Sequence, residues 1–410
     1  MLLTGTVRHR TVSPFTEDPH VTNPTNSADI AVPSRLGVGP MSKNAVDAAI
    51  QVAYRRKRRL MLIPSRRQVE AAEQGGGYVE GWTTESFAEY VRSRDPEGLI
   101  LLCRDHGGPY QNPQERLQRY SVEQAMKSAA ESYAEDIRQG FDLLHVDTSV
   151  DLDGVASLED AIDRAVELYG QSVETARSLG RATLFEIGFE DQGSDTNDPE
   201  EFEEQVTTAL ERLKGAGLPL PTFIVAQTAT KVMETRNVGA LTIAPFAVAS
   251  AVRSLVAVTR RHGIALKAHN CDYLSRDQLR FLNAAGVDAL NVAPEFGVVE
   301  TRAFLSLLEE LNLPVQRERF LEAAYDSGSW AKWMHPQTTA SDTDRAVIAG
   351  HYTFATEDFQ ALKEVAGHFA AKKGIDVDAR LRDAVDRAID HYAEALPDGV
   401  SAGRDTAVAV

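Results

Sequence analysis

Eight short apolar segments recur along this chain, with longer polar or amphipathic segments between them. Each apolar segment has four or five residues and few polar positions on either face, which is typical of parallel strands that helices cover on both sides. The longer segments carry helix boundaries, because Ser121 and Ser275 begin capping boxes and Gly140 and Gly180 stand where helices would end. The expected strands are residues 35–39, 60–63, 99–103, 143–146, 183–187, 222–226, 265–268 and 289–292.

Eight alternations of strand and helix predict an α/β fold, a closed TIM (β/α)8 barrel. A doubly wound open sheet is the alternative, but no glycine-rich dinucleotide-binding turn follows the first expected strand. We expect residues 33–312 to form the barrel and 313–396 to form extra C-terminal helices that flank it, at a candidate oligomer contact. Residues 1–32 are expected to be a polar N-terminal extension, and 397–410 a tail.

The chain has 410 residues and a net charge of −17, which argues against a nucleic-acid or anionic-membrane partner. Its basic run from Arg55 to Arg59 fits the solvated last turn of a helix better than an anion-binding patch. Two cysteines, Cys103 and Cys271, cannot form a disulfide framework and therefore favour a reducing compartment. Since no apolar stretch suits a signal peptide or a membrane span, we expect a cytoplasmic protein.

Polar side chains follow most of the expected strands, at the edge where barrel enzymes place their active sites. Asp105 and His106 follow the third expected strand, and His269 follows the seventh. Two histidines with a carboxylate or amide oxygen can bind zinc, manganese or a similar divalent ion. Their convergence predicts one metal-dependent site at one end of the barrel. The other strand-end residues of this kind are Asp147, Glu186, Gln227, Asn270, Asp272 and Asn291.

Each of these residues also has a structural interpretation. A histidine beside a strand is more often a hydrogen-bonded structural residue than a ligand, and Asp105 could cap backbone N–H groups of a loop. For His145 the structural role is favoured more strongly, because it lies inside an apolar run, one residue before Val146. The number of metal-competent strand ends, rather than any single residue, therefore supports the site.

At these positions the chain resembles the Z-type subunit of class II D-tagatose-bisphosphate aldolase and the related metal-dependent ketose 4-epimerases. The resemblance runs from about Gly37 to about Leu311, and the order of its motifs is more specific than any one of them. The motifs are Gly37-Val38-Gly39-Pro40, Arg104-Asp105-His106-Gly107-Gly108-Pro109, His145-Val146-Asp147-Thr148-Ser149, Phe185-Glu186-Ile187-Gly188 and Ala268-His269-Asn270-Cys271-Asp272-Tyr273.

The resemblance implies a TIM barrel of the class II aldolase kind and a divalent metal, either zinc or manganese or another such ion. It implies that His106 and His269 bind the metal with Gln227 as a further ligand. It also implies that Asp105 transfers protons, and it carries Glu186 over as a ligand or base. Substrate contacts are expected from Asp147, Asn270, Asp272, Asn291 and Arg345.

One departure from the family pattern concerns phosphate. Where catalytic class II aldolases usually have a glycine-serine loop after the strand-seven histidine, this chain has Asn270-Cys271-Asp272-Tyr273. An aspartate and a tyrosine do not favour a phosphate dianion. A phosphate would therefore meet another group, such as Arg66, Arg67 or Arg345, or the substrate lacks one phosphate.

The expected function is cleavage of a C–C bond in a ketose or sugar phosphate through an enediolate, with the metal on the carbonyl and Asp105 taking the hydroxyl proton. Release of the aldehyde would make the chain an aldolase, and rotation followed by re-addition would make it a C4 epimerase. A non-catalytic subunit that stabilises a partner aldolase chain is the alternative, and a metal-free sugar-binding barrel is a third interpretation.

Overall fold

The structure is a computed structural model that describes residues 30–189 and 196–396. The expectations for the first 29 residues and for the 397–410 tail lie outside the described residues. Eight parallel strands close into a barrel, because the first strand pairs with the last, and this confirms the predicted TIM barrel. The strands are β1 (Leu36–Val38), β2 (Leu60–Leu62), β3 (Ile100–Gly107), β4 (Leu143–Asp147), β7 (Leu184–Gly188), β8 (Phe223–Ala226), β11 (Ala265–Ala268) and β12 (Ala289–Val292).

Alternate residues of these strands point into the barrel and fill it in layers. The layer at the amino end is apolar and includes Val32, from the segment that precedes β1. Counting along the strands by twos leads from this layer to polar residues, for example from Leu143 to His145 and Asp147. The barrel is therefore apolar at its amino end and polar at its carboxyl end. The other buried residues of this apolar cluster are Met61, Ile63, Leu101, Cys103, Phe223, Ala265 and Ala289.

Eight helices cover the outside of the barrel, and their apolar faces pack against the outward-facing strand residues. The capping boxes expected at Ser121 and Ser275 are both present. None of the described helices combines the length and apolar character that a bilayer crossing needs. The covering helices are α1 (Lys43–Arg56), α2 (Thr84–Arg94), α4 (Val122–Arg138), α5 (Leu158–Ser178), α6 (Pro199–Gly215), α8 (Pro245–Arg261), α9 (Arg276–Ala285) and α10 (Pro294–Glu310).

The loops that leave the carboxyl ends of the strands carry small elements of their own. Two are hairpins, formed by β5 (Val150–Asp151) with β6 (Gly154–Val155) and by β9 (Val232–Met233) with β10 (Arg236–Asn237). The others are short helices that add to the wall around the carboxyl end of the barrel. They are η1 (Ala72–Gln74), α3 (Pro113–Leu117) and α7 (Ala240–Ile243).

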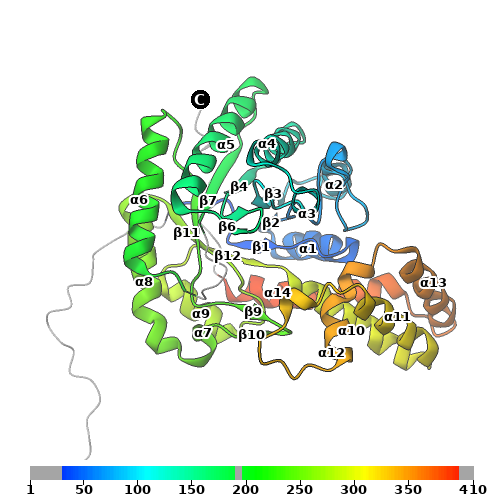
Figure 1. The fold of residues 1–410 in the computed structure, drawn as a ribbon. Helices are drawn as coiled ribbons and strands as arrows, with labels where there is room; N and C mark the ends of the chain where they lie inside the picture. The colour runs from blue at the N-terminus through cyan, green and yellow to red at the C-terminus, as the bar shows by residue number, and fades with distance from the viewer. Residues whose placement is uncertain (1–29, 190–195, 397–410) are drawn as a thin grey trace, which may run out of the picture.

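The residues after α10 form a helical layer beside the barrel (Figure 1). Its core is aromatic, because Phe304 of α10 lies 5.2 Å from Phe320 and 5.1 Å from Phe359, measured between ring centroids. The last helix leaves this layer and packs along α1 and α10. The elements are α11 (Pro314–Asp326), η2 (Ala331–Trp333), α12 (Asp342–Ala349), η3 (Gly350–Thr353), α13 (Glu357–Ala371) and α14 (Val377–Ala395).

The basic run at the end of α1 holds this last helix in place. Arg55 pairs with Asp386 at 2.8 Å, and Arg56 pairs with Asp390 at 2.8 Å. Arg58 donates hydrogen bonds to the last backbone carbonyls of α14. Arg55 and Arg56 form the last turn of α1, as predicted for this run. The same cations are in addition partners for a helix more than 300 residues later in the chain.

Strand β3 is irregular where it carries two of the predicted site residues, Asp105 and His106. Its register against β4 shifts between Arg104 and Gly107, and His106 has a φ of 43°, in the left-handed region. The buried Arg104 side chain fixes the strand at this point: it forms two hydrogen bonds to Asp136 of α4, at 2.8 and 2.6 Å, and donates to the Val69 carbonyl at 2.6 Å. A bulge of this kind re-aims the side chains that it carries.

Glu300 of α10 is buried against the start of α1, and its protonation can be tested. Its carboxyl group is buried and accepts hydrogen bonds from Ser42 and from Asn44 Nδ2, the latter at 2.8 Å. Burial raises the pKa of Glu300 to about 7, against the opposing hydrogen bonds. The unfolded chain releases this proton at lower pH than the folded chain, so this group destabilises the fold progressively as pH rises from about 4 to 7.

We therefore expect Glu300→Gln to raise the free energy of unfolding at pH 8 by about 3–4 kcal/mol, from a rise from 4.5 to about 7 worth about 1.4 kcal/mol per pKa unit, and to change it little at pH 4. Urea unfolding at both pH values measures this difference. Glu309→Gln, at an exposed position of the same helix, is the control. An equal effect of Glu300→Gln at both pH values would contradict the raised pKa.

Candidate functional site

Three imidazole rings meet at the carboxyl end of the barrel. His106 belongs to β3, His145 to β4, and His269 follows β11. Their ring centroids lie 5.5 Å (His106–His145), 5.2 Å (His106–His269) and 5.3 Å (His145–His269) apart. One nitrogen from each ring lies within 4.8 Å of the others, so the three rings could hold one metal ion.

Asp105 lies among these rings. Its Oδ1 is 3.5 Å from His145 Nδ1 and 3.7 Å from His269 Nε2, and its Oδ2 is 4.0 Å from His106 Nε2. Burial opposes ionisation, but His106 and His269 outweigh it and hold the pKa of the Asp105 carboxyl well below its usual range. Burial lowers the pKa of His269 well below its ordinary value, which favours the neutral ring that a metal requires.

Asp147 lies behind His106 and orients its ring. The Asp147 carboxylate is 2.8 Å from His106 Nδ1, and it also accepts hydrogen bonds from Gln111 Nε2 at 2.8 Å and from Ser149 Oγ at 2.6 Å. Against the effect of burial, the contact with His106 lowers the pKa of Asp147 to about 2. A carboxylate on one ring nitrogen leaves the other, Nε2, turned toward Asp105, which is the arrangement common behind metal-binding histidines.

Asn291 connects two members of the cluster. Its Nδ2 donates to Asp105 Oδ1 at 3.2 Å and lies 3.0 Å from His269 Nε2. The neighbouring strand makes room for it, because a Cβ at Gly37 would lie 2.2 Å from Asn291 Oδ1. Asn291 can therefore take this position only because residue 37, in β1, has no side chain.

A buried ion pair lies one layer deeper. Lys267 Nζ donates to Glu186 Oε2 at 2.7 Å, and Glu186 Oε1 is 4.0 Å from His145 Nδ1. Glu186, Asp105, His145 and His269 form a second group that could hold an ion. We did not identify Lys267 from the sequence, although a lysine between apolar residues of a buried strand needs a charged partner inside the barrel.

The remaining strand-end residues take different positions around the cluster. Asn270 has a φ of 56°, and its Nδ2 donates to Gln227 Oε1 at 3.2 Å. Asp272 accepts backbone hydrogen bonds from Ala293 and Glu295 at the start of α10. Burial, reinforced by the nearby charge of Glu295, raises the pKa of Asp272 to about 7.

A cavity of about 350 Å³ opens above the cluster. Barrel residues form its floor, among them Asp105, His106 and His269, and the helical layer supplies part of its wall through Trp333 and Tyr352. The other predicted site residues that line it are Asn270, Asp272 and Asn291.

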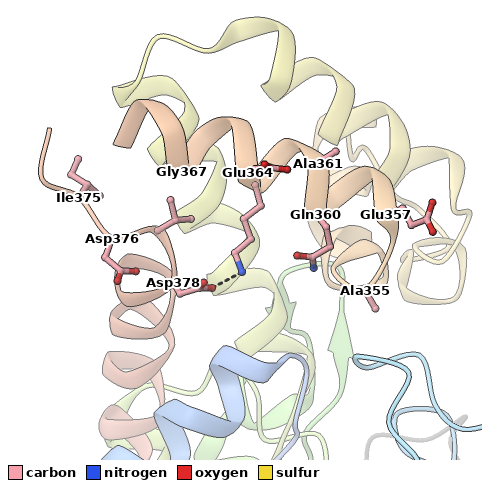
Figure 2. Close-up of a pocket in the computed structure, with 11 residues that line it drawn as sticks. Ala355, Glu357, Gln360, Ala361, Glu364, Gly367, Ile375, Asp376 and Asp378 are labelled. Carbon is pink, nitrogen blue, oxygen red and sulfur yellow. Dashed lines mark ion pairs between the residues drawn. The ribbon is translucent and has the colours of Figure 1, made fainter. Parts of the chain in front are cut away.

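A larger depression of about 780 Å³ lies on α13 and the start of α14, far from these residues in the fold (Figure 2). Most of its lining residues are exposed, and its one drawn ion pair joins Lys363 to Asp378.

The three candidate arginines are distributed differently. Arg67 lines the cavity. Arg66 is buried elsewhere and pairs with Glu70 at 2.6 Å and Glu115 at 2.7 Å, which is a structural role. Arg345 lies on α12, pairs with Asp342 at 3.1 Å and is not among the cavity-lining residues of the described chain.

The contact between Gly37 and Asn291 can be tested by unfolding. We expect Gly37→Ala to lower the free energy of unfolding by about 1–3 kcal/mol, because the added methyl group overlaps the Asn291 side chain. The double variant Gly37→Ala with Asn291→Ala should recover part of this loss. Gly154→Ala, where a Cβ meets no atom within 4 Å, is the control and should change stability by less than about 0.5 kcal/mol. Additive losses in the double variant would contradict the contact.

The comparisons with known proteins agree with this architecture. Residues 33–346 match the family described as D-tagatose-1,6-bisphosphate aldolase subunit GatZ/KbaZ-like. No curated protein shows a significant sequence match to the chain. A probable tagatose 6 phosphate kinase from Sinorhizobium meliloti 1021 has a TM-score of 0.67 at 22% identity, over 88% of this chain and 100% of that chain.

A second similar structure is the fructuronate-tagaturonate epimerase UxaE from Cohnella laeviribosi. It has a TM-score of 0.53 at 13% identity, over 88% of this chain and 82% of that chain. At such identities both structures bear on the fold alone. The family match extends over most of the chain and confirms the resemblance noted from the strand-end motifs: the chain belongs to the D-tagatose-1,6-bisphosphate aldolase subunit GatZ/KbaZ-like family.

Proposed function

We propose that this chain is a metal-dependent aldolase or epimerase that cleaves a C–C bond in a ketose or ketose phosphate. The observation that carries the proposal is the convergence of three imidazoles with Asp105 at one end of the barrel, where Asp105, His106 and His269 line a cavity. The family match supports a tagatose-bisphosphate aldolase-like setting. Cytoplasmic localisation, a small sugar or sugar phosphate as the ligand, and the absence of nucleic-acid and membrane partners belong to the same proposal.

The proposed metal ligands are His106, His145 and His269. This set differs from the one the resemblance implied, because His145 takes the place of Gln227, whose Oε1 accepts a hydrogen bond from Asn270. The donor set fits zinc, and manganese is the alternative ion. A divalent ion bound there would polarise a ketose carbonyl and stabilise the negative charge of an enediolate.

Asp105 is the proposed proton carrier. It lies at the cavity floor, and Asn291 holds its Oδ1 through a hydrogen bond of 3.2 Å. Against the effect of burial, His106 and His269 hold its pKa well below the usual range, so the carboxyl group is ionised and can accept a proton. Glu186 is proposed to support His145 from below, since Lys267 already pairs with its carboxylate.

Cleavage and epimerisation use these residues in the same way. Asp105 takes the proton of the hydroxyl group whose carbon–carbon bond breaks, and an aldehyde forms as the electron pair moves to the enediolate. Departure of the aldehyde and protonation of the enediolate carbon complete an aldolase reaction. For an epimerisation, the aldehyde rotates in the cavity, the enediolate carbon adds to the other face of its carbonyl to re-form the C–C bond, and Asp105 returns the proton to the new alkoxide.

A second candidate function is a non-catalytic subunit that stabilises a partner aldolase chain or forms a homo-oligomer. The family description, which names an aldolase subunit, favours it. Such a subunit needs no metal of its own, so metal content separates the two candidates.

The first test is the metal content of the purified protein after dialysis against a chelator and resupply of zinc or manganese. We expect about one ion per chain in the wild type and in the control His262→Ala, which lies at the end of α8. His106→Ala, His145→Ala and His269→Ala should each lose the ion. A wild type that binds no divalent ion would favour the partner-subunit candidate.

The second test concerns Asp105. We expect Asp105→Asn to keep the metal and to lower the rate of ketose cleavage or C4 epimerisation by about 10²–10⁴-fold, because a proton carrier is lost. Assays of ketoses and their phosphates with the metal-loaded protein measure this change. A rate equal to that of the wild type would show that another group carries the proton.

A further inference from the structure

The aldolase form of the proposed reaction needs a proton at carbon as well as a base for the hydroxyl group. Asp105 takes the hydroxyl proton, and the enediolate carbon then has to gain a proton before the reaction is complete. Asp105 is ionised beforehand, because His106 and His269 hold its pKa well below the usual range, so it brings no proton of its own. A second carboxyl group that favours its protonated form would suit the carbon step.

Asp272 has the position that such a group needs. It is only 2% exposed and lines the same cavity as Asp105. Its Oδ1 accepts the backbone N–H groups of Ala293, at 3.0 Å, and of Glu295, at 2.9 Å. Within residues 30–189 and 196–396, Oδ2 accepts no hydrogen bond. Oδ2 is therefore the oxygen that can carry a proton toward a bound substrate.

The end of β12 holds both cavity carboxyl groups. Asn291 donates to Asp105 Oδ1 at 3.2 Å, and Ala293, two residues later, donates its backbone N–H to Asp272 Oδ1. Two residues of chain extend by at most about 7 Å, so the points that anchor the two carboxyl groups are close together. The carbon chain of a small sugar can extend between them.

The loop that carries Asp272 is fixed on two sides. From the β9–β10 hairpin, Asn237 Nδ2 donates to the backbone carbonyls of Asn270 at 2.8 Å and of Asp272 at 3.0 Å. On the other side, the Tyr273 backbone N–H donates to Glu295 Oε2 at 2.5 Å. The Asp272 side chain is thus held in place before any substrate arrives, which favours a catalytic role.

Glu295 makes Asp272 the protonated member of an acidic pair. Burial raises the pKa of Glu295, but hydrogen bonds from the Tyr392 hydroxyl and the Tyr273 backbone oppose that rise and favour the ionised form. Burial and the charge of Glu295 raise the pKa of Asp272 to about 7. The environments of Asp105 and Asp272 therefore push their pKa values in opposite directions, as in sites that pair a base with an acid.

Other titratable or charged groups also surround Asp272. Those on the side of α10 and α14 are Tyr273, Arg302, His391 and Tyr392. Those on the cavity side are Arg67, Asp105, His106, Lys231, His269 and Lys332.

We propose that Asp272 is the acid that protonates the enediolate carbon, which makes this site an aldolase site rather than an epimerase site. The Oδ2–H bond breaks, the electron pair of the enediolate forms a C–H bond with that proton, and the carbonyl group re-forms. Asp272 remains as a carboxylate and regains a proton from water. An epimerase does not use this step, because its enediolate carbon must return to the aldehyde. The inference rests on the proposed function, since it assigns a further step at the same site.

The experiment measures exchange of carbon-bound hydrogen, the reverse of this step. The zinc-loaded full-length protein is incubated in D₂O with dihydroxyacetone or dihydroxyacetone phosphate, and NMR follows deuterium entering the hydroxymethyl carbon. We expect exchange with the wild type and a loss of at least about 100-fold in Asp272→Asn, whose amide oxygen can accept the same backbone hydrogen bonds but cannot exchange the proton. Asp277→Asn, at an exposed position of α9, is the matched control and should exchange as the wild type does.

The pH dependence identifies the group that titrates. Removal of a carbon-bound hydrogen needs the carboxylate form of Asp272, so exchange should rise with pH and level off above about 7. Glu295→Gln removes a charge that raises the pKa of Asp272 and should move the midpoint to lower pH. An unshifted midpoint would show that another group titrates and would overturn the assignment.

Cleavage assays on the same proteins separate this inference from the proposed function. A wild type that neither cleaves ketoses nor exchanges hydrogen would overturn both. A wild type that cleaves or epimerises a ketose without exchange, or an Asp272→Asn variant that exchanges normally, would overturn the inference alone.

The carboxyl proton can also be observed without metal or substrate. Infrared spectra of the chelator-treated protein at pH 6 should contain a protonated-carboxyl band that Asp272→Asn lacks. Both proteins should carry Glu300→Gln, because burial raises the pKa of Glu300 to about 7 as well. Identical spectra would show that Asp272 holds no proton and would overturn the proposal.

Discussion

The position of the candidate site depends on one buried arginine. Arg104 is fully buried on the outward side of β3, and Asp136 neutralises it through two hydrogen bonds. A buried charge left without its partner destabilises a fold by about 3–5 kcal/mol, so β3 and α4 are held together at this point. The same guanidinium binds the backbone carbonyls of Pro64 and Val69 in the loop after β2. Because Arg104 is fixed in this way, the backbone of the next two residues of β3, Asp105 and His106, is fixed as well.

The barrel could be predicted from the sequence because its strands are buried on both sides and therefore read as separate apolar runs. All eight expected segments form the strands of the closed sheet, with ends that differ by a residue or two except in β3. Strand β3 continues to Gly107, four residues beyond its expected end, since its polar residues are buried: Arg104 against α4, and Asp105 beside the histidines inside the barrel. Local apolar character cannot reveal a polar strand end that other strands cover.

The same limit explains which site residues were found. Asp105, His106 and His269 stand out because they follow apolar runs, whereas His145 lies within one and was interpreted as structural. Alternation within the strand contains the missing information: Leu143 faces the barrel interior, so His145 faces it too. Lys332 and Trp333 line the cavity, but no local sequence pattern predicts this. Their position depends on how the segment after residue 326 packs against the β9–β10 hairpin.

The docking of α14 on α1 has a consequence for how the protein is made. The ribosome releases α1 directly after β1, but the helix that covers its outer side follows more than 300 residues later. Until then the apolar and cationic groups on that side of α1 have only water or other molecules as neighbours, and closing so long a loop is slow. This side of α1 therefore stays uncovered until α14 has been synthesised, a period in which a chaperone has an open surface to bind.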